Sequence, residues 1–321
     1  MLKLNTLSGF GSGVAGGATV DPIYGYWSGG EPSGMTDVTD RIIYSTSVTS
    51  ANTDSDLSTA KNGATGISDT TTYGYIVGGS SGAVVDTTDR IVFSTSVTSA
   101  NTDSDLPTAT TLASTTGMSD STTYGYYISG NTGAVVDTAF RMTFSTGAFA
   151  ANTDSDFIDD AQQVLIVSDP DTYGYSAGGY DGYAGRLAPA GRLVYSTSVM
   201  SARTDVDLSQ GRNSGTGLTD GVTYGYYMGG HSGASSSITD RITYSTSVAA
   251  AHTDSDLTVA GHGIGGNGDN ATYGYVGGGS GTILTNTERM TYSTGVCAKN
   301  TDSDLSTGGS NISSYSDGSP N

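Results

Sequence analysis

Acidic side chains recur in one short motif, which is where metal chemistry would be sought first. Oxygen-bearing residues at alternate positions of Asn-Thr-Asp-Ser-Asp-Leu resemble the first half of a calcium-binding loop. However, no glycine follows the third ligand position, no distal glutamate closes the loop, and Arg203 would repel a cation in one copy. The motif therefore favours an Asx-type turn at the end of a solvated strand over a metal site. Its copies begin at Asn52, Asn101, Asn152, Arg203, His252 and Asn300.

The histidines could support zinc binding if the fold brought them together. His231, His252 and His262 occupy different positions of the sequence repeat, so three zinc ligands would require chance proximity. The sequence also has no P-loop and no H-E-x-x-H motif. The Ser and Asp residues recur with the repeat, whereas a catalytic site usually breaks repeat symmetry. We therefore expect a non-enzymatic protein without a cofactor or a metal.

Six of the nine arginines share one repeat position and could line an anion site. Asp40, Asp89 and Asp240 precede three of them, and Glu288 precedes a fourth. Consecutive strand residues point to opposite faces, so each arginine is expected to reach an acid or a backbone carbonyl in the neighbouring repeat. A structural fork between repeats is favoured, and an anion-binding ring is the functional alternative. These arginines are Arg41, Arg90, Arg141, Arg192, Arg241 and Arg289.

The elements that position these residues are six copies of one unit. A Tyr-Gly-Tyr triplet recurs every 49 or 51 residues, and each triplet is followed by one of the six arginines. Extra residues fall in a loop of repeat 4 and in a segment of repeat 2, and insertions collect in loops. The triplets begin at Tyr24, Tyr73, Tyr124, Tyr173, Tyr224 and Tyr273.

Each repeat carries strand signals at period 2 and no helix signal. In repeat 2, Tyr73, Tyr75 and Val77 fall on one face, and Ile91 and Phe93 alternate in the next strand. A polar strand follows, and a strand of small residues, such as 64–68, ends the unit. Four short strands per roughly 50 residues are the blade of a β-propeller. We expect an all-β, six-bladed propeller with the small-residue strands at the axis and the polar strands at the rim.

The repeats resemble those of the kelch family, over residues 24 to about 317. A hydrophobic strand ends in Gly-Gly, a strand ending in an aromatic follows, and "LSTAKNG" is similar to the loop into the next blade. The tryptophan usual after the kelch hairpin is missing, and repeat 3 has Ser129-Gly130 at the double glycine. The form rich in "TDRIxYST" looks most like kelch-like repeats in virion proteins of tailed bacteriophages. The matching double glycines are Gly29-Gly30, Gly78-Gly79, Gly178-Gly179, Gly229-Gly230 and Gly278-Gly279.

Repeat 4 breaks the symmetry and supplies the candidate binding residues. Its enlarged loop contains Tyr180, Asp181, Tyr183 and Arg186. Tyrosine and arginine are favoured at binding hot spots, and tyrosine rings can stack on sugars. The alternative is a loop that is longer without a function.

Composition restricts the partners. The formal net charge is −19 and no basic run exists, so a nucleic-acid ligand and an anionic membrane are unfavourable. A single cysteine, Cys297, excludes an internal disulfide framework. No apolar run of signal-peptide or membrane-span length is present. We expect a virion structural or attachment protein that contacts other virion proteins, its own copies or a host surface glycan; the alternatives are a cell-surface adhesin or lectin-like module and a propeller glycoside hydrolase.

Two segments compete to close the ring. Residues 13–20 lie just before Tyr24, whereas residues 310–317 follow the sixth repeat in the same register as the internal copies. Because a one-residue slip turns every side chain to the wrong face, the register favours the C-terminal segment. We therefore expect a propeller over 24–321 closed by 310–317, with 1–23 as an N-terminal arm or extra strand.

Overall fold

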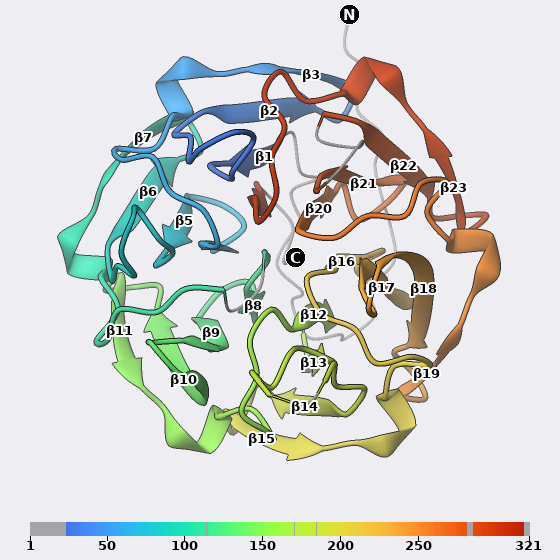
Figure 1. The fold of residues 1–321 in the computed structure, drawn as a ribbon. Helices are drawn as coiled ribbons and strands as arrows, with labels where there is room; N and C mark the ends of the chain where they lie inside the picture. The colour runs from blue at the N-terminus through green and yellow to red at the C-terminus, as the bar shows by residue number, and fades with distance from the viewer. Residues whose placement is uncertain (1–23, 113–114, 170, 184, 281–284, 318–321) are drawn as a thin grey trace, which may run out of the picture.

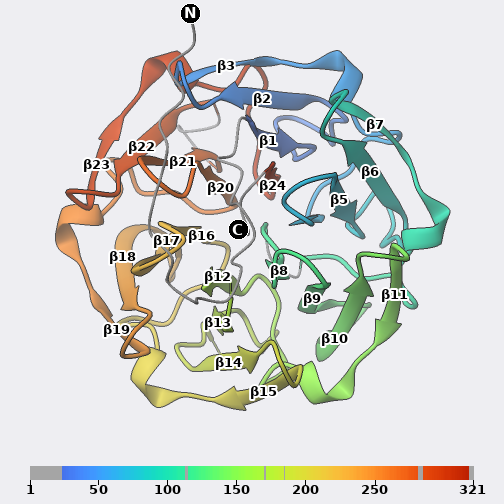
Figure 2. The same ribbon diagram turned by 180° about the vertical axis from the view of Figure 1, so that it is seen from behind.

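The protein forms a closed ring of six four-stranded antiparallel sheets, seen along its axis in Figures 1 and 2. The structure is a computed structural model that describes residues 24–112, 115–169, 171–183, 185–280 and 285–317. The regular elements of these residues are strands and short 3₁₀ turns. The expected all-β, six-bladed propeller with four strands per blade is confirmed.

The strands of each blade run in order from the axis to the rim. Blade 1 contains β24 (Ser313–Ser316), β1 (Tyr24–Ser28), β2 (Thr39–Ile43) and β3 (Val48–Ala51). Blade 2 contains β4 (Thr65–Ser68), β5 (Tyr73–Val77), β6 (Thr88–Val92) and β7 (Val97–Ala100). Blade 3 contains β8 (Met118–Ser119), β9 (Tyr124–Asn131), β10 (Val135–Thr143) and β11 (Ala148–Ala151). Blade 4 contains β12 (Leu165–Asp169), β13 (Tyr173–Ala177), β14 (Ala190–Val194) and β15 (Val199–Ala202). Blade 5 contains β16 (Thr216–Thr219), β17 (Tyr224–His231), β18 (Ser235–Thr243) and β19 (Val248–Ala251). Blade 6 contains β20 (Ile264–Gly268), β21 (Tyr273–Gly278), β22 (Thr287–Thr291) and β23 (Val296–Lys299).

Small residues occupy the axial strands because neighbouring blades crowd them. Every residue of β4 and β16 is buried, whereas β3 and β7 at the rim are mostly exposed. A Cβ atom at Gly66 would overlap the carbonyl oxygen of Ser314, and one at Gly217 would overlap that of Ile166. The expected placement is found in part: β12 at the axis contains Leu165, Ile166 and Val167, and the rim strands β11 and β19 are formed by Ala, Phe and Val rather than by polar residues.

Aromatic rings fill the spaces between blades. The second tyrosine of each Tyr-Gly-Tyr triplet stacks on an aromatic ring of the following blade, with centroids 5.9–6.3 Å apart. Each such ring buries a large apolar area, so no blade can bury its faces alone. The stacked pairs are Tyr26–Phe93, Tyr75–Phe144, Tyr126–Tyr195, Tyr175–Tyr244, Tyr226–Tyr292 and Tyr275–Tyr44.

The C-terminal strand completes blade 1. β24 pairs antiparallel with β1, with Tyr26 opposite Tyr315 and their rings stacked 5.2 Å apart. Both rings are fully buried. The competing N-terminal segment, residues 13–20, and the expected arm, residues 1–23, lie outside the described residues. The axial position beside β1 is held by β24.

The Asn-Thr-Asp-Ser-Asp-Leu motif forms a turn that joins neighbouring blades. In the first copy, Thr53–Ser55 make a 3₁₀ turn, and Oδ1 of Asp56 accepts the main-chain N–H of Thr39 at 2.8 Å. The Oγ of Ser55 donates to the carbonyl of Ser96 in blade 2 at 2.6 Å. The expected turn is confirmed. In this copy Asn52 donates to Ser55 Oγ and accepts no main-chain N–H, whereas in the last copy Oδ1 of Asn300 accepts the N–H of Asp302 at 3.3 Å, as in an Asx turn.

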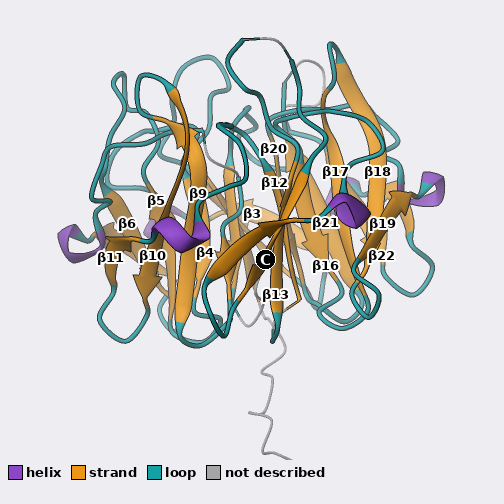
Figure 3. Cartoon of the chain, turned by 90° about the horizontal axis from the view of Figure 1, so that it is seen from below, coloured by secondary structure: helices purple, strands orange, loops and turns teal. Residues whose placement is uncertain are grey.

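The two ends of the ring differ, as the side view in Figure 3 shows. One end carries loops such as 29–38, 78–87 and 178–189, and the β9–β10 and β17–β18 hairpins. We call it the loop face. The opposite end carries the tight turns between the two outer strands of each blade, such as 44–47, and we call it the turn face.

Candidate binding site on the loop face

A closed ring of main-chain hydrogen bonds surrounds the axis near the loop face. Six residues, one from each chain segment leading into an axial strand, donate an N–H to the carbonyl of the neighbouring member at 2.5–2.9 Å. All six have positive φ, between 54° and 67°. The cavity beside them measures about 10 Å³, space for roughly one water. The six residues are Gly63, Leu112, Gln163, Ser214, Gly263 and Asn311.

A second ring of side chains lies on the loop face and contains five residue types in its six positions. The residue after each double glycine forms a main-chain bridge with the segment leading into the same blade. Neighbouring blades are also linked there: Asn62 donates to Glu31 at 2.7 Å, and Asn131 donates to Gln162 at 2.9 Å. The residues after the double glycines are Glu31, Ser80, Asn131, Tyr180, His231 and Ser280.

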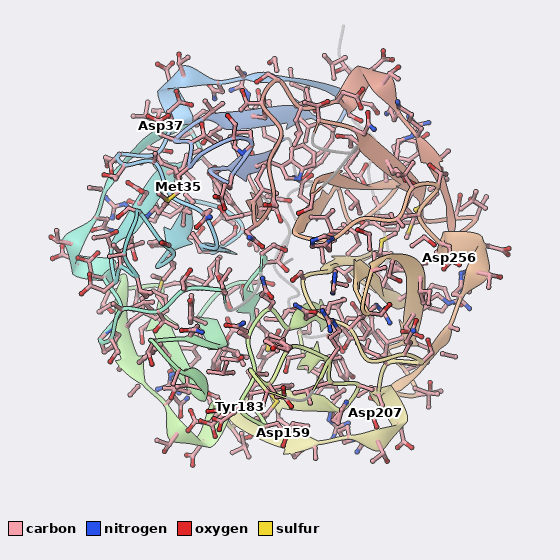
Figure 4. All side chains as sticks on the ribbon, viewed as in Figure 1. Met35, Asp37, Asp159, Tyr183, Asp207 and Asp256 are labelled. Carbon is pink, nitrogen blue, oxygen red and sulfur yellow. The ribbon has the colours of Figure 1, made fainter. Side chains whose placement is uncertain are left out.

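The four binding residues expected in repeat 4 do not form one cluster in the structure. Tyr180 and Arg186 form a main-chain bridge, and the guanidinium carbon of Arg186 lies 5.8 Å from the Tyr180 ring centroid. Asp181 instead organises the loop, since its Oδ1 accepts the N–H groups of Tyr183 and Gly185. Tyr183 is 96% exposed and lies away from the axis in Figure 4. Tyr180 and Arg186 are thus brought together, and Tyr183 stands apart at the tip of the loop.

Two histidines join Arg186, a contact that the sequence pattern did not predict. Arg186 Nε donates to His231 Nδ1 at 2.9 Å, and the rings of His231 and His262 lie 4.9 Å apart, edge to face. Ser235 Oγ lies 2.9 Å from His262 Nδ1. The sequence signal for this contact is the spacing of 31 residues between His231 and His262, because Glu31 and Asn62, which also bind each other, have the same spacing. His252 lies elsewhere, in a rim turn, where its Nδ1 contacts Ser255.

Burial and charge favour the neutral form of both histidines. Burial, and then the charge of Arg186, lowers the pKa of His231. Burial, followed by His231 and Arg186, lowers the pKa of His262. Because a guanidinium cannot accept a hydrogen bond, His231 Nδ1 must be the acceptor, and the proton of neutral His231 lies on Nε2. The cluster therefore contains an N–H donor at Nε2 of His231.

The six repeated arginines lie near the turn face, half-buried on tyrosine. Each guanidinium carbon is 4.3–4.6 Å from the ring centroid of the triplet's first tyrosine. Four arginines also donate to a turn serine of the next blade; Arg141 donates to Ser198 at 3.0 Å. The expected contact between blades is found at these four, but its acceptor is a hydroxyl rather than an acid or a carbonyl. For Arg90 and Arg241, the equivalent turn position of the next blade holds Gly147 and Gly295, which have no hydroxyl.

The acids beside these arginines point to the opposite side and are buried. Asp89 pairs with Lys61 at 3.0 Å, and Asp240 pairs with Arg212 at 2.7 Å. Asp40 has no cation at the equivalent position, where Gly309 stands, and accepts the N–H groups of Ser306 and Thr307. These acids therefore connect the third strand of a blade to the chain segment that leads into the axial strand of the same blade.

In the described part of the chain, neither the nucleophile motif nor the possible metal ligands have the arrangement that catalysis or metal binding requires. Gly78–Gly82 spell G-x-S-x-G, but Ser80 lies in a loop where it bridges Asn62, without the strand–turn–helix that exposes a nucleophile. Within the described residues, no group of three His, Cys, Asp or Glu side chains is arranged to hold a metal ion. The same residues contain no helix of the length and apolarity needed to span a membrane.

No family model matches the chain, and a search of curated proteins finds no match either. The fold assignment therefore rests on the geometry of the six blades.

Proposed function

We propose that this propeller is a non-enzymatic platform for attachment or assembly, and that its loop face binds a surface saccharide. The observation that carries the proposal is a contrast within the chain. The aromatic stack and the strand order repeat in all six blades, whereas the residue after the double glycine is Glu, Ser, Asn, Tyr, His and Ser in blades 1 to 6. A surface that varies on a constant scaffold is the usual arrangement of a binding face.

The chemistry of the loop face supports a saccharide ligand. Amide, imidazole and tyrosine side chains surround the mouth of the ring, including Asn62, Asn131 and His231. Such groups donate and accept hydrogen bonds with hydroxyls, and the exposed ring of Tyr183 offers an apolar face to a sugar ring.

We place the platform on a virus particle, as a kelch-like repeat protein of the kind found in virions of tailed bacteriophages. The support is the resemblance of the repeats and the acidic surface, with a net charge of −19 that opposes nucleic-acid binding. A cell-surface adhesin or lectin-like module would use the same loop face. Finding the protein either on virus particles or on the cell surface would distinguish the virion assignment from the adhesin assignment.

The saccharide proposal is tested by screening a panel of host-surface saccharides against the purified chain. Tyr183→Ala should lower binding of the ligand found. Val222→Ala is the matched control, because Val222 is 82% exposed on the turn face. Equal loss in both variants, or binding unaffected by any loop-face substitution, would contradict the proposal. Hydrolysis of the panel would instead identify a propeller glycoside hydrolase.

The assignment to a virion is tested by labelling the protein with an antibody in native particles and in host cells. We expect label on a tail, fibre or capsid. Label confined to the cell envelope would favour the adhesin.

A further inference from the structure

We propose that Arg186, His231 and His262 form a subsite for the carboxylate of an acidic saccharide. This inference rests on the proposed function and deepens it, because it names the chemical class of the ligand. The three residues come from three different chain segments on the loop face: the repeat 4 loop, the end of β17 and the segment leading into β20.

The first argument is electrostatic. Lys61 and Arg212 are buried in ion pairs, and Arg203 at the rim pairs with Asp205. The six repeated arginines lie on tyrosine rings near the turn face. Within the described residues, Arg186 lies on the loop face with no carboxylate within 4.0 Å. In an acidic protein this cation is the natural contact for an anionic group.

The second argument is the geometry of the donors. Nε of Arg186 is used by His231, and in the described part of the chain neither Nη1 nor Nη2 has a hydrogen-bond acceptor. The two Nη atoms form one edge of the guanidinium, which matches the two oxygens of a carboxylate. The hydrogen bond to His231 holds the guanidinium in place before a ligand arrives. The Nε2–H of His231 adds a further donor in the same cluster.

The third argument is that the arrangement opposes a metal ion. A metal needs an imidazole lone pair, and the Nδ1 lone pair of His231 already accepts from Arg186. Arg186 would also repel a cation at this position. Asp181, the nearest acid along the loop, directs Oδ1 to the N–H groups of its own loop. The cluster is therefore arranged for an anion.

The subsite also lies beside surfaces that suit the rest of a sugar. The Tyr180 ring lies next to the Arg186 guanidinium, and exposed Tyr183 belongs to the same loop. A saccharide whose carboxylate binds Arg186 would reach these rings through its neighbouring units. This combination favours an oligosaccharide over a free small anion.

The test measures affinity of the full-length chain for a hexuronate oligosaccharide by isothermal titration calorimetry. The carboxyl-reduced oligosaccharide and a sulfated neutral one are the comparison ligands. We expect the hexuronate to bind at least tenfold more tightly than either. Equal affinity for the reduced ligand would overturn the subsite, and equal affinity for the sulfated ligand would overturn its assignment to a carboxylate.

Variants distinguish a specific role of Arg186 from a general effect of positive charge on binding. Arg186→Gln should lower hexuronate affinity at least tenfold, and Arg186→Lys should lower it less while keeping the charge. Arg203→Gln is the matched control, since it removes the same charge from the rim near blade 4. Thermal melting of each variant verifies that it is folded. Equal loss in Arg186→Gln and Arg203→Gln would contradict the proposal.

The two proposals fail in different ways. Binding of neutral saccharides that depends on Tyr183 but not on Arg186 would remove the subsite and leave the proposed function standing. Failure of every saccharide, neutral or acidic, to bind would contradict both.

Discussion

The main-chain N–H of Tyr24 donates a hydrogen bond to Oδ1 of Asp317, at 2.7 Å, across 293 positions of sequence. Inside the chain the same bond links an aspartate to the tyrosine four residues later, as from Tyr73 to Asp69 at 2.8 Å. The chain therefore closes blade 1 with the local geometry that joins the axial strand to the second strand inside other blades, but without a covalent link between the two strands.

Truncation after Thr307 tests this closure. It removes Ile312 and Tyr315, both buried, together with the strand that pairs with β1. We expect a loss of at least ~3 kcal/mol in the free energy of unfolding, because removing one large buried aromatic side chain alone costs about this much. Urea denaturation measures the loss. An unchanged midpoint would show that another segment can take the place of β24.

The turn serines are expected to stabilise the contact between blades. Ser198 Oγ lies 2.8 Å from the hydroxyl of Tyr126 and accepts from Arg141. Ser198→Ala should lower the free energy of unfolding by ~1–3 kcal/mol, because buried polar atoms lose their partner. Gly147→Ser is the reciprocal variant and should remain within ~1 kcal/mol of wild type, since the hydroxyl gained near Tyr75 offsets the cost of a left-handed non-glycine residue. Equal stability of all three proteins would refute this role.

The buried ion pair of blade 2 can be compared with the unpaired acid of blade 1. Asp89→Asn leaves the ammonium of Lys61 buried without its carboxylate, and we expect a cost of ~3–5 kcal/mol. Asp40→Asn leaves no cation behind and should cost much less. Thermal and urea denaturation of both variants give the comparison. A larger effect at Asp40 would contradict the assignment.

The pH dependence of stability should reveal the burial of Asp40. Burial raises the pKa of Asp40 above that of an ordinary aspartate. The folded state therefore binds this proton more tightly than the unfolded state, and stability from this group falls as pH rises from the ordinary aspartate pKa through the raised one. Asp40→Asn should gain stability relative to wild type over this window. A constant difference between the two proteins at all pH values would rule the effect out.

The repeated acidic motif is expected to be insensitive to calcium. Its second aspartate already accepts a main-chain N–H in each blade, as Asp56 does from Thr39. Adding EDTA or Ca²⁺ should leave the melting temperature unchanged, because a ligand of the native state alone would raise it. A drop with EDTA that Ca²⁺ reverses would require a cation site.

The sequence by itself determined the blade count, the strand order and the register of closure. A period-2 pattern in each repeat decides which side chains face the neighbouring blade, and the spacing of the Tyr-Gly-Tyr triplets counts the blades. The match of residues 310–317 to the internal copies was enough to favour the C-terminal strand. These features are local or repeat along the chain, so they are visible without coordinates.

Only the tertiary structure decided which residues of different blades meet. Ser198 accepts from Arg141 and His231 contacts His262 because the ring packs each blade against the following one. The distance between two such residues depends on the tilt and closure of the whole ring, which sequence periodicity does not encode. For the same reason the pairing of the arginines with hydroxyls, and the cluster around Arg186, emerged only from the folded ring.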